Sequence, residues 1–352
     1  MRPRAPRRVA RAFASAVAAL VAALLDPLPA RAQFAAESPS LEVRRLDPRF
    51  DALVAPAARG EKIVAGHVWL EGPSWDARQG ALYFSDVVKN RLWRWTPGDG
   101  TDLVLAPSGT ARAGAHSTRE PGSNGSALDA QGRLLLCEHG DRRITRLEPG
   151  GAKTVVAARY QGKRLNSPND LWLARDGALY FSDPPFGLPG HFADPAKELP
   201  WQGVYRVRDG ELELLTREVR APNGLALSPD ERTLYVANAD RENPEWYAFA
   251  LAEDGRLGEK RTFADARAAV ARYAGAPDGL ETDERGNLWA AGPGGVTVFA
   301  PDGARLGELL TGIATSNVAF GGEHGTTLFV TASSAIWRIE TRVRSSQSSP
   351  SH

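Results

Sequence analysis

Sulfur and excess charge are both scarce in this sequence. Its 352 residues include one methionine and one cysteine, Cys137, so no intrachain disulfide can form and no zinc site can be built on thiolates. We interpret Cys137 as a small hydrophobic residue buried in a strand. The formal net charge is only +1, which gives no electrostatic basis for binding nucleic acid or an anionic membrane surface.

The apolar run near the N-terminus is too short to span a bilayer. It extends from Ala12 to Leu25 and is interrupted only by Ser15. Arginines precede it and Ala30 and Ala32 follow it in a small-x-small pattern, which predicts an export signal over residues 1–32 that is cleaved after Ala32. An uncleaved anchor is the alternative. We expect the mature protein to be periplasmic or secreted, without stable membrane insertion after cleavage.

The dominant pattern is a short phrase that occurs six times. Its clearest copy runs from Pro168 to Asp183 and reads PNDLWLARDGALYFSD. Each copy has a leading polar residue, an apolar stretch, a tight turn, a second apolar stretch and a polar end. The leading polar residues are Glu71, Asn124, Asn169, Asn223, Asp278 and Asn317, spaced by 53, 45, 54, 55 and 39 residues. Strand-rich repeats of about 40–50 residues are typical of propeller blades.

We therefore predict an all-β fold, a six-bladed β-propeller of four-stranded blades. The last repeat ends after its third strand, and the extra strand at Lys62 to Gly66 is the expected replacement, so that an N-terminal strand closes the ring. The predicted boundaries are a signal peptide at 1–32, an N-terminal lead-in at 33–60, the propeller domain at 61–342 and a disordered tail at 343–352.

Two long segments interrupt the repeats. Residues Pro107 to Pro121 contain His116, and residues Gly187 to Pro200 lie between a second and a third strand. Long ordered loops at one end of a scaffold often serve as lids or binding loops.

The six leading residues offer only carboxylates and carboxamides. The first strand of each propeller blade lines the central channel, so these residues should meet in one ring. One alternative is that Pro-Asn-Gly and Pro-Asp-Gly are merely turn signals, but that reading explains Glu71 poorly. Oxygen ligands without thiolate or imidazole favour Ca²⁺, Mg²⁺ or Mn²⁺ over zinc. Such an ion polarises a carbonyl or phosphoryl oxygen and lowers the pKa of bound water.

Several motifs together resemble the SMP-30/gluconolactonase/luciferin-regenerating family, and its bacterial gluconolactonase branch most closely. They are EGPSW at Glu71, NSPNDL from Asn166, YFSDPPFGL from Tyr180, PNGLALSPD from Pro222 and PDGLETDERGNLW from Pro277. The resemblance extends from about Lys62 to Ile339 and implies a six-bladed propeller with one catalytic divalent cation.

The resemblance also implies the site residues. It places the metal ligands on Glu71, Asn169, Asn223 and Asp278 and makes Asp278 the general base or nucleophile. Members of the family hydrolyse sugar lactones, and relatives hydrolyse organophosphates. Ca²⁺ is the expected cation, with Mn²⁺, Mg²⁺ or Zn²⁺ as alternatives.

The resulting hypothesis is an exported, metal-dependent hydrolase that opens a sugar lactone such as glucono-1,5-lactone. The side chains expected to bind substrate hydroxyls are Asn124, Asn317, His116 and His139. For the two histidines the alternative is a surface or structural role. Two other functions remain open: phosphotriester hydrolysis at the same metal site, and a non-catalytic binding platform with a structural ion.

Overall fold

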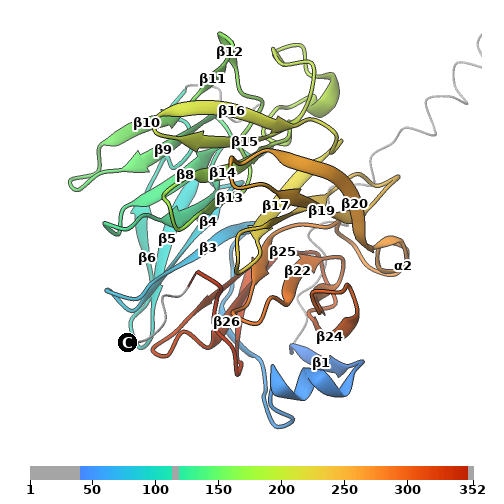
Figure 1. The fold of residues 1–352 in the computed structure, drawn as a ribbon. Coiled ribbons are helices and arrows are strands. Elements are labelled where there is room, and N and C mark those ends of the chain that lie inside the picture. Colours follow the sequence, from blue (N-terminus) through green and yellow to red (C-terminus); the bar gives the residue numbers. More distant parts are fainter. Residues whose placement is uncertain (1–39, 113–118, 348–352) are drawn as a thin grey trace, which may run out of the picture.

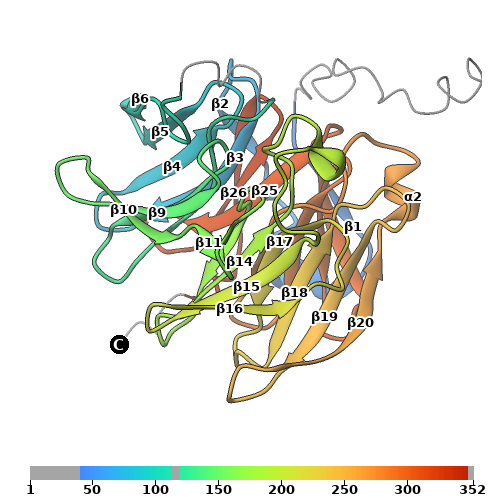
Figure 2. The same cartoon turned by 90° about the horizontal axis from the view of Figure 1, so that it is seen from above.

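Six antiparallel sheets surround a common centre in the computed structural model, which describes residues 40–112 and 119–347. Figures 1 and 2 show the sheets fanned around this centre in chain order. The predicted six-bladed β-propeller is confirmed. The predicted signal at 1–32 and His116 lie outside the described residues. Within the part of the chain that is described, no helix is long and apolar enough to cross a membrane.

The first three blades follow one another without exchange of strands. Blade 1 contains β3 (Leu70–Asp76), β4 (Ala81–Asp86), β5 (Arg91–Thr96) and β6 (Gly100–Leu105). Blade 2 contains β7 (Ser123–Leu128), β8 (Leu134–Glu138), β9 (Arg143–Leu147) and β10 (Lys153–Ala157). Blade 3 contains β13 (Leu171–Leu173), β14 (Leu179–Asp183), β15 (Gly203–Arg208) and β16 (Glu211–Thr216). A small hairpin, β11 (Arg159–Tyr160) and β12 (Lys163–Arg164), lies between blades 2 and 3 in the sequence.

Blade 4 is also built from consecutive strands, whereas blades 5 and 6 each take in one strand from the N-terminal part of the chain. Blade 4 contains β17 (Pro222–Leu227), β18 (Thr233–Asn238), β19 (Glu245–Leu251) and β20 (Leu257–Asp265). Blade 5 contains β21 (Leu280–Thr282), β22 (Leu288–Gly292), β23 (Gly295–Phe299), β24 (Arg305–Leu310) and, as a fifth strand, β1 (Glu42–Arg45). Blade 6 contains β25 (Thr315–Gly321), β26 (Thr327–Ala332), β27 (Ala335–Glu340) and β2 (Glu61–Val64). The short helices are η2 (Pro48–Ala52), η4 (His191–Ala193) and α2 (Arg267–Val270).

Aromatic side chains fill the spaces between blades. Trp75 of blade 1 stacks on Phe329 of blade 6, with ring centroids 5.3 Å apart. Trp289 and Phe320 make the corresponding contact between blades 5 and 6, at 5.4 Å. All residues of an inner strand such as β4 are buried, and successive side chains of a strand point to opposite faces, so both faces of a blade contribute to the core.

The ring closes through β2, as the missing fourth strand predicts. β2 pairs antiparallel with β27, with Glu61 opposite Arg338 and Lys62 opposite Trp337. An ion pair of 2.7 Å joins Arg338 to Glu61, and the Lys62 ammonium lies 5.1 Å from the Trp337 ring. The pairing covers the outer edge of β27, which would otherwise offer free backbone groups to another chain.

The N-terminal lead-in is more ordered than its composition suggests. β1 pairs with β24, and η2 begins at the N-cap Asp47, whose carboxylate accepts a 2.8 Å hydrogen bond from the Arg49 backbone N–H. Phe50 of η2 is fully buried. It packs against Gly307 so closely that a Cβ there would lie 2.6 Å from the phenyl ring. The segment therefore covers the outer strand of blade 5.

The predicted disorder of the C-terminal tail is wrong for residues 343–347. Val343 is fully buried, and the Ser345 hydroxyl donates a 3.0 Å hydrogen bond to the Glu281 carboxylate. The Gln347 side chain donates to the Leu173 carbonyl at 2.9 Å. The serine-rich composition that suggested disorder instead supplies polar partners for buried groups of blades 3 and 5. Residues 348–352 lie outside the described residues.

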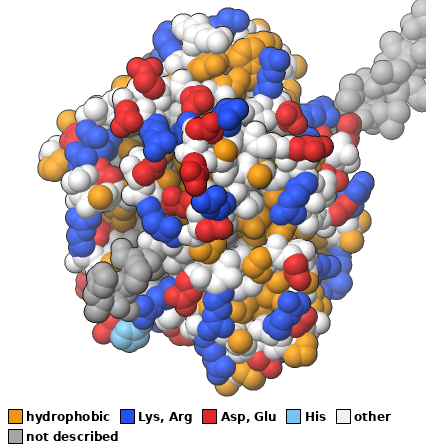
Figure 3. Space-filling model, in the orientation of Figure 1, with side chains coloured by type: hydrophobic (Ala, Val, Ile, Leu, Met, Phe, Trp, Pro, Cys, Tyr) orange, Lys and Arg blue, Asp and Glu red, His pale blue; other side chains and the backbone are white. Residues whose placement is uncertain are grey.

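Charges are mixed over the surface. Figure 3 shows acidic and basic side chains interspersed on one face. This distribution matches the formal net charge of +1.

Truncation of Phe50 tests whether the lead-in is part of the fold. Phe50→Ala should lower the free energy of unfolding by about 3–5 kcal/mol, because it leaves a cavity between η2 and β24. Leu46→Ala is the matched control, since Leu46 lies in the same segment with 46% of its surface exposed, and it should change stability by less than about 0.5 kcal/mol. Urea unfolding measures both. Equal, small effects would mean that the lead-in does not contribute to the core.

Candidate functional site

The six polar residues that lead the repeats lie at the same end of the six innermost strands. Four of them are within strands: Glu71 in β3, Asn124 in β7, Asn223 in β17 and Asn317 in β25. Asn169 and Asp278 stand two residues before β13 and β21. All are buried except Asp278, which is half-buried. The sequence-predicted ring is therefore present at one end of the channel.

Glycines bring neighbouring parts of the ring into contact. A Cβ on Gly224 would lie 2.3 Å from the Asp278 carbonyl oxygen, and one on Gly279 would lie 2.0 Å from Oδ1 of Asn317. The Gly279 N–H also donates to the Ser316 carbonyl at 2.8 Å. Glycine is thus required after Asn223 and Asp278, because a larger residue at either position would push adjacent blades apart.

The polar residue at the end of the second strand of a blade binds the backbone just before the leading residue of the first strand. In blade 3, the Asp183 carboxylate accepts hydrogen bonds from the backbone N–H groups of Asn166, at 2.8 Å, and Ser167, at 2.9 Å. In blade 4, Oδ1 of Asn238 accepts one from Ala221 N–H at 3.0 Å. The second strand therefore determines where the leading residue of the first strand lies.

Burial and mutual repulsion oppose ionisation of the ring carboxylates. Desolvation, followed by the nearby Asp170 and Glu120 carboxylates, raises the pKa of Glu71 from its ordinary value to about 8. Desolvation, followed by the charge of Glu71, raises the pKa of Asp278 well above its ordinary value. The two carboxylates therefore lie close enough to repel each other.

Two carboxamide oxygens of the ring are left without a partner. Oδ1 of Asn124 and Oδ1 of Asn223 are buried, and neither accepts a hydrogen bond from the described residues. A buried acceptor without a partner costs about 1–3 kcal/mol. The free oxygen of Asn223, in the same ring as the Glu71 and Asp278 carboxylates, fits a hard divalent cation. The amide oxygen would coordinate such a cation, and the carboxylates would balance its charge. The described residues contain no cluster of three or more His, Cys, Asp and Glu able to hold a metal, so a cation site in the ring would need amide ligands.

Asn317 and His139, which the sequence predicts to bind substrate, both have neighbours within the protein. Asn317 is engaged within the protein: its Oδ1 accepts from Val318 N–H at 2.8 Å, and its Nδ2 donates to Asp170 at 3.4 Å. His139 is fully buried beside Asn169, with 3.4 Å between Nε2 and the amide nitrogen Nδ2.

Sequence reasoning missed two acidic residues beside the ring, Asp170 and Glu120. Desolvation raises the pKa of Asp170 to about 7. The sequence did mark Asp170 as unusual, because it follows Asn169 at the position where glycine follows Asn223 and Asp278. Glu120, which is half-buried, lies in an irregular segment and has no such signal.

A cavity of about 710 Å³ extends the channel on the side of the hairpin turns. Asp170 and Asn317 line it, together with Glu281 and Ser345. The ring thus lies between this cavity and the opposite face of the propeller, and the C-terminal tail contributes to the cavity wall.

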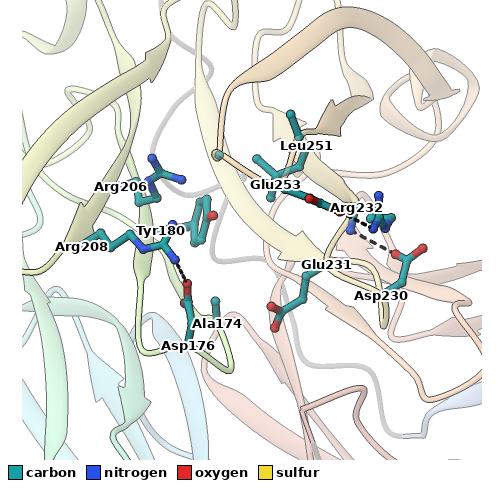
Figure 4. A pocket seen from close by; sticks show the side chains of 12 residues that line it. Ala174, Asp176, Tyr180, Arg206, Arg208, Asp230, Glu231, Arg232, Leu251 and Glu253 are labelled. Carbon is teal, nitrogen blue, oxygen red and sulfur yellow. Dashed lines mark hydrogen bonds and ion pairs between the residues drawn. The ribbon is translucent and has the colours of Figure 1, made fainter.

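A smaller pocket of about 210 Å³ lies between blades 3 and 4 (Figure 4). Its charged side chains neutralise one another, with Arg208 2.8 Å from Asp176 and Arg232 2.9 Å from Glu253. It is formed by hairpin turns, at the ends of the strands away from the ring. We assign it no chemistry.

The buried Glu281 predicts how stability depends on pH. Desolvation raises the pKa of Glu281 to about 8, so between its ordinary pKa and pH 8 the folded protein keeps a proton that the unfolded chain releases. Its favourable contribution is therefore complete below the ordinary pKa and is lost as pH rises through about 8. The free energy of unfolding should therefore fall between pH 5 and pH 9. In Glu281→Gln this fall should be smaller by on the order of 2–4 kcal/mol, because the amide does not ionise.

Urea unfolding in EDTA at both pH values measures this effect. Glu253→Gln is the control, because 85% of the Glu253 side chain is exposed, and it should leave the pH dependence unchanged. An unchanged dependence in Glu281→Gln would mean that this carboxyl is not protonated in the folded protein.

Comparisons with known proteins agree with this geometry. Residues 69–334 match the family model described as SMP-30/Gluconolactonase/LRE-like region. A gluconolactonase from Zymomonas mobilis is 40% identical over 308 residues, which cover 86% of this chain and 86% of that protein. A 6-deoxy-6-sulfogluconolactonase from Pseudomonas putida is 30% identical over 267 residues, covering 75% of this chain and 82% of that protein.

Solved structures give the same picture. The structure of a gluconolactonase from Xanthomonas campestris is 36% identical, with a TM-score of 0.74, and covers 90% of this chain and 99% of that one. A luciferin-regenerating enzyme has a TM-score of 0.65 at 18% identity, covering 82% of this chain and 97% of that one, which supports the fold alone.

Proposed function

Because the chain belongs to the SMP-30/Gluconolactonase/LRE-like family, we propose that it hydrolyses sugar lactones at the ring of polar residues. The observation that carries this proposal is the match to gluconolactonases over 86–90% of the chain. The family model matches residues 69–334, a span that includes every leading residue of the ring. The product would be the open-chain hydroxy acid. Residues 1–32, which lie outside the described residues, would direct the enzyme to the periplasm or the medium.

The residues proposed to hold a divalent cation are Glu71, Asn169, Asn223 and Asp278. The unpartnered Oδ1 of Asn223 and the raised pKa values of Glu71 and Asp278 support this set. Ca²⁺ suits an all-oxygen site best, and Mn²⁺, Mg²⁺ and Zn²⁺ are the alternatives. When bound, such a cation polarises the lactone carbonyl and lowers the pKa of bound water.

Asp278 is the proposed general base. Among the six ring residues it is the one that is only half-buried, which leaves part of the residue accessible to water. The ionised carboxylate, which the positive charge of a bound cation would favour over the protonated form, takes a proton from a water molecule while the water oxygen bonds to the carbonyl carbon. The ring C–O bond then breaks, and the departing ring oxygen receives a proton.

Substrate hydroxyls would be bound by the remaining polar groups. Asn124 has a free, buried Oδ1 and is the better placed acceptor, whereas both ends of the Asn317 amide already have partners. His139 stands beside Asn169, and His116 lies outside the described residues.

Replacement of Asp278 tests the catalytic proposal. Asp278→Asn should lower kcat for glucono-1,5-lactone by about 10²–10⁴-fold, because the amide cannot accept the proton. Asp176→Asn is the control, since Asp176 lies in the pocket between blades 3 and 4, and it should retain full activity. Proton release measures turnover, and circular dichroism shows that both variants fold. A platform with a structural ion would instead show no turnover in either protein.

Metal removal tests the cation directly. EDTA-treated protein that circular dichroism shows to be folded should lose lactone hydrolysis, and one of Ca²⁺, Mn²⁺, Mg²⁺ or Zn²⁺ should restore it. Equal rates before and after stripping would exclude a catalytic metal. If activity with a phosphotriester returns with the ion while lactone is not hydrolysed, the site is a phosphotriesterase.

A further inference from the structure

His139 is held rigidly next to a proposed metal ligand. It follows β8, is fully buried, and its backbone N–H donates to the Gly122 carbonyl at 3.1 Å. Gly187 packs against it from the other side, so closely that a Cβ on that glycine would lie 2.6 Å from Cβ of His139. The imidazole is thus confined between the segment before β7 and the segment after β14.

The two ring nitrogens of His139 face different partners. Nε2 lies 3.4 Å from Nδ2 of Asn169, and Nδ1 lies 3.4 Å from a carboxylate oxygen of Glu120. The amide nitrogen of Asn169 can only donate, so Nε2 must be the acceptor and the imidazole proton must be on Nδ1. Nδ1 is buried and forms no aligned hydrogen bond within the described residues, which leaves the Glu120 carboxylate as the group beside that proton.

This arrangement determines which end of the Asn169 amide is available to the ring. With Nδ2 turned to His139, Oδ1 points away from the imidazole. In the reversed orientation of the Asn169 amide, the lone pairs of Oδ1 and of Nε2 would face each other and repel. The NH₂ group, which cannot coordinate a cation, would then point away from His139 in place of Oδ1. The imidazole therefore favours one of two amide orientations that are otherwise nearly equal in shape.

We propose that His139 is a positioning residue that keeps Oδ1 of Asn169 available to a cation, and that Glu120 favours the Nδ1–H tautomer this requires. The inference rests on the proposed function, because it takes Asn169 as a metal ligand. Its role differs from the substrate binding first expected of His139. Partners of this kind behind a ligand commonly contribute 10–100-fold in metal affinity.

Calcium affinity measured by isothermal titration calorimetry tests the proposal without reference to turnover. Met and Gln have similar size and flexibility, but only Gln has an acceptor for the Asn169 amide. His139→Met should weaken Ca²⁺ binding by about 10–100-fold, whereas His139→Gln should stay within about threefold of wild type. Thermal unfolding without Ca²⁺ confirms that both variants fold. Equal affinities in the two variants would overturn the proposal.

A double-mutant cycle shows whether His139 acts through Asn169. In an Asn169→Ala background there is no amide to orient, so His139→Met should cause no further loss of Ca²⁺ affinity. Additive losses would overturn the positioning role while leaving the proposed lactonase activity intact. Failure of the wild-type protein to bind Ca²⁺, with no lactone turnover on any cation, would overturn both proposals.

Discussion

The convergence of six inner strands on one axis is the constraint on which the site depends. Strands that meet at an axis leave little space, so Gly224 and Gly279 are needed where adjacent blades touch. The same crowding excludes water from the side chains at the end of each strand. Desolvation and mutual repulsion therefore oppose ionisation of the buried Glu71 and the half-buried Asp278. The carboxamide oxygens of Asn124 and Asn223 have no partner among the described residues. The unfavourable desolvation of these carboxylates and the unpartnered oxygens are the basis on which a cation site is proposed.

Support for this ring comes from residues that do not belong to it. Asp183 and Asn238 bind the loops before Asn169 and Asn223 through backbone N–H groups, and His139 contacts the Asn169 amide directly. These contacts fix both the position of a ligand and the direction in which it presents its oxygen. A carboxamide needs the second kind of control more than a carboxylate does, because only one of its two ends can coordinate a cation.

The repeat phrase allowed the six blades and the six leading residues to be predicted, because strand alternation and turn signals are local. The closing strand was predicted at Lys62 to Gly66 and is found at Glu61–Val64. What escaped prediction depends on tertiary contact. β1 is short, and Phe50 is buried only because blade 5 lies over it. The sequence around Ser345 is typical of a disordered segment, and only the folded structure brings Ser345 into contact with Glu281. Glu120 has no pattern of its own, and its relation to His139 exists only in the folded protein.

Closure of blade 6 has a consequence for biosynthesis. Its sheet joins β2 (Glu61–Val64) to strands that end at Glu340, so the two partners are separated by nearly the whole propeller. A chain that emerges from the ribosome N-terminus first cannot complete this sheet until its last blade has been made. Earlier blades can form, but the axis stays open and the polar residues stay apart. A fragment that stops short of β27 therefore lacks the closed ring, and its six leading residues cannot be assembled around the axis.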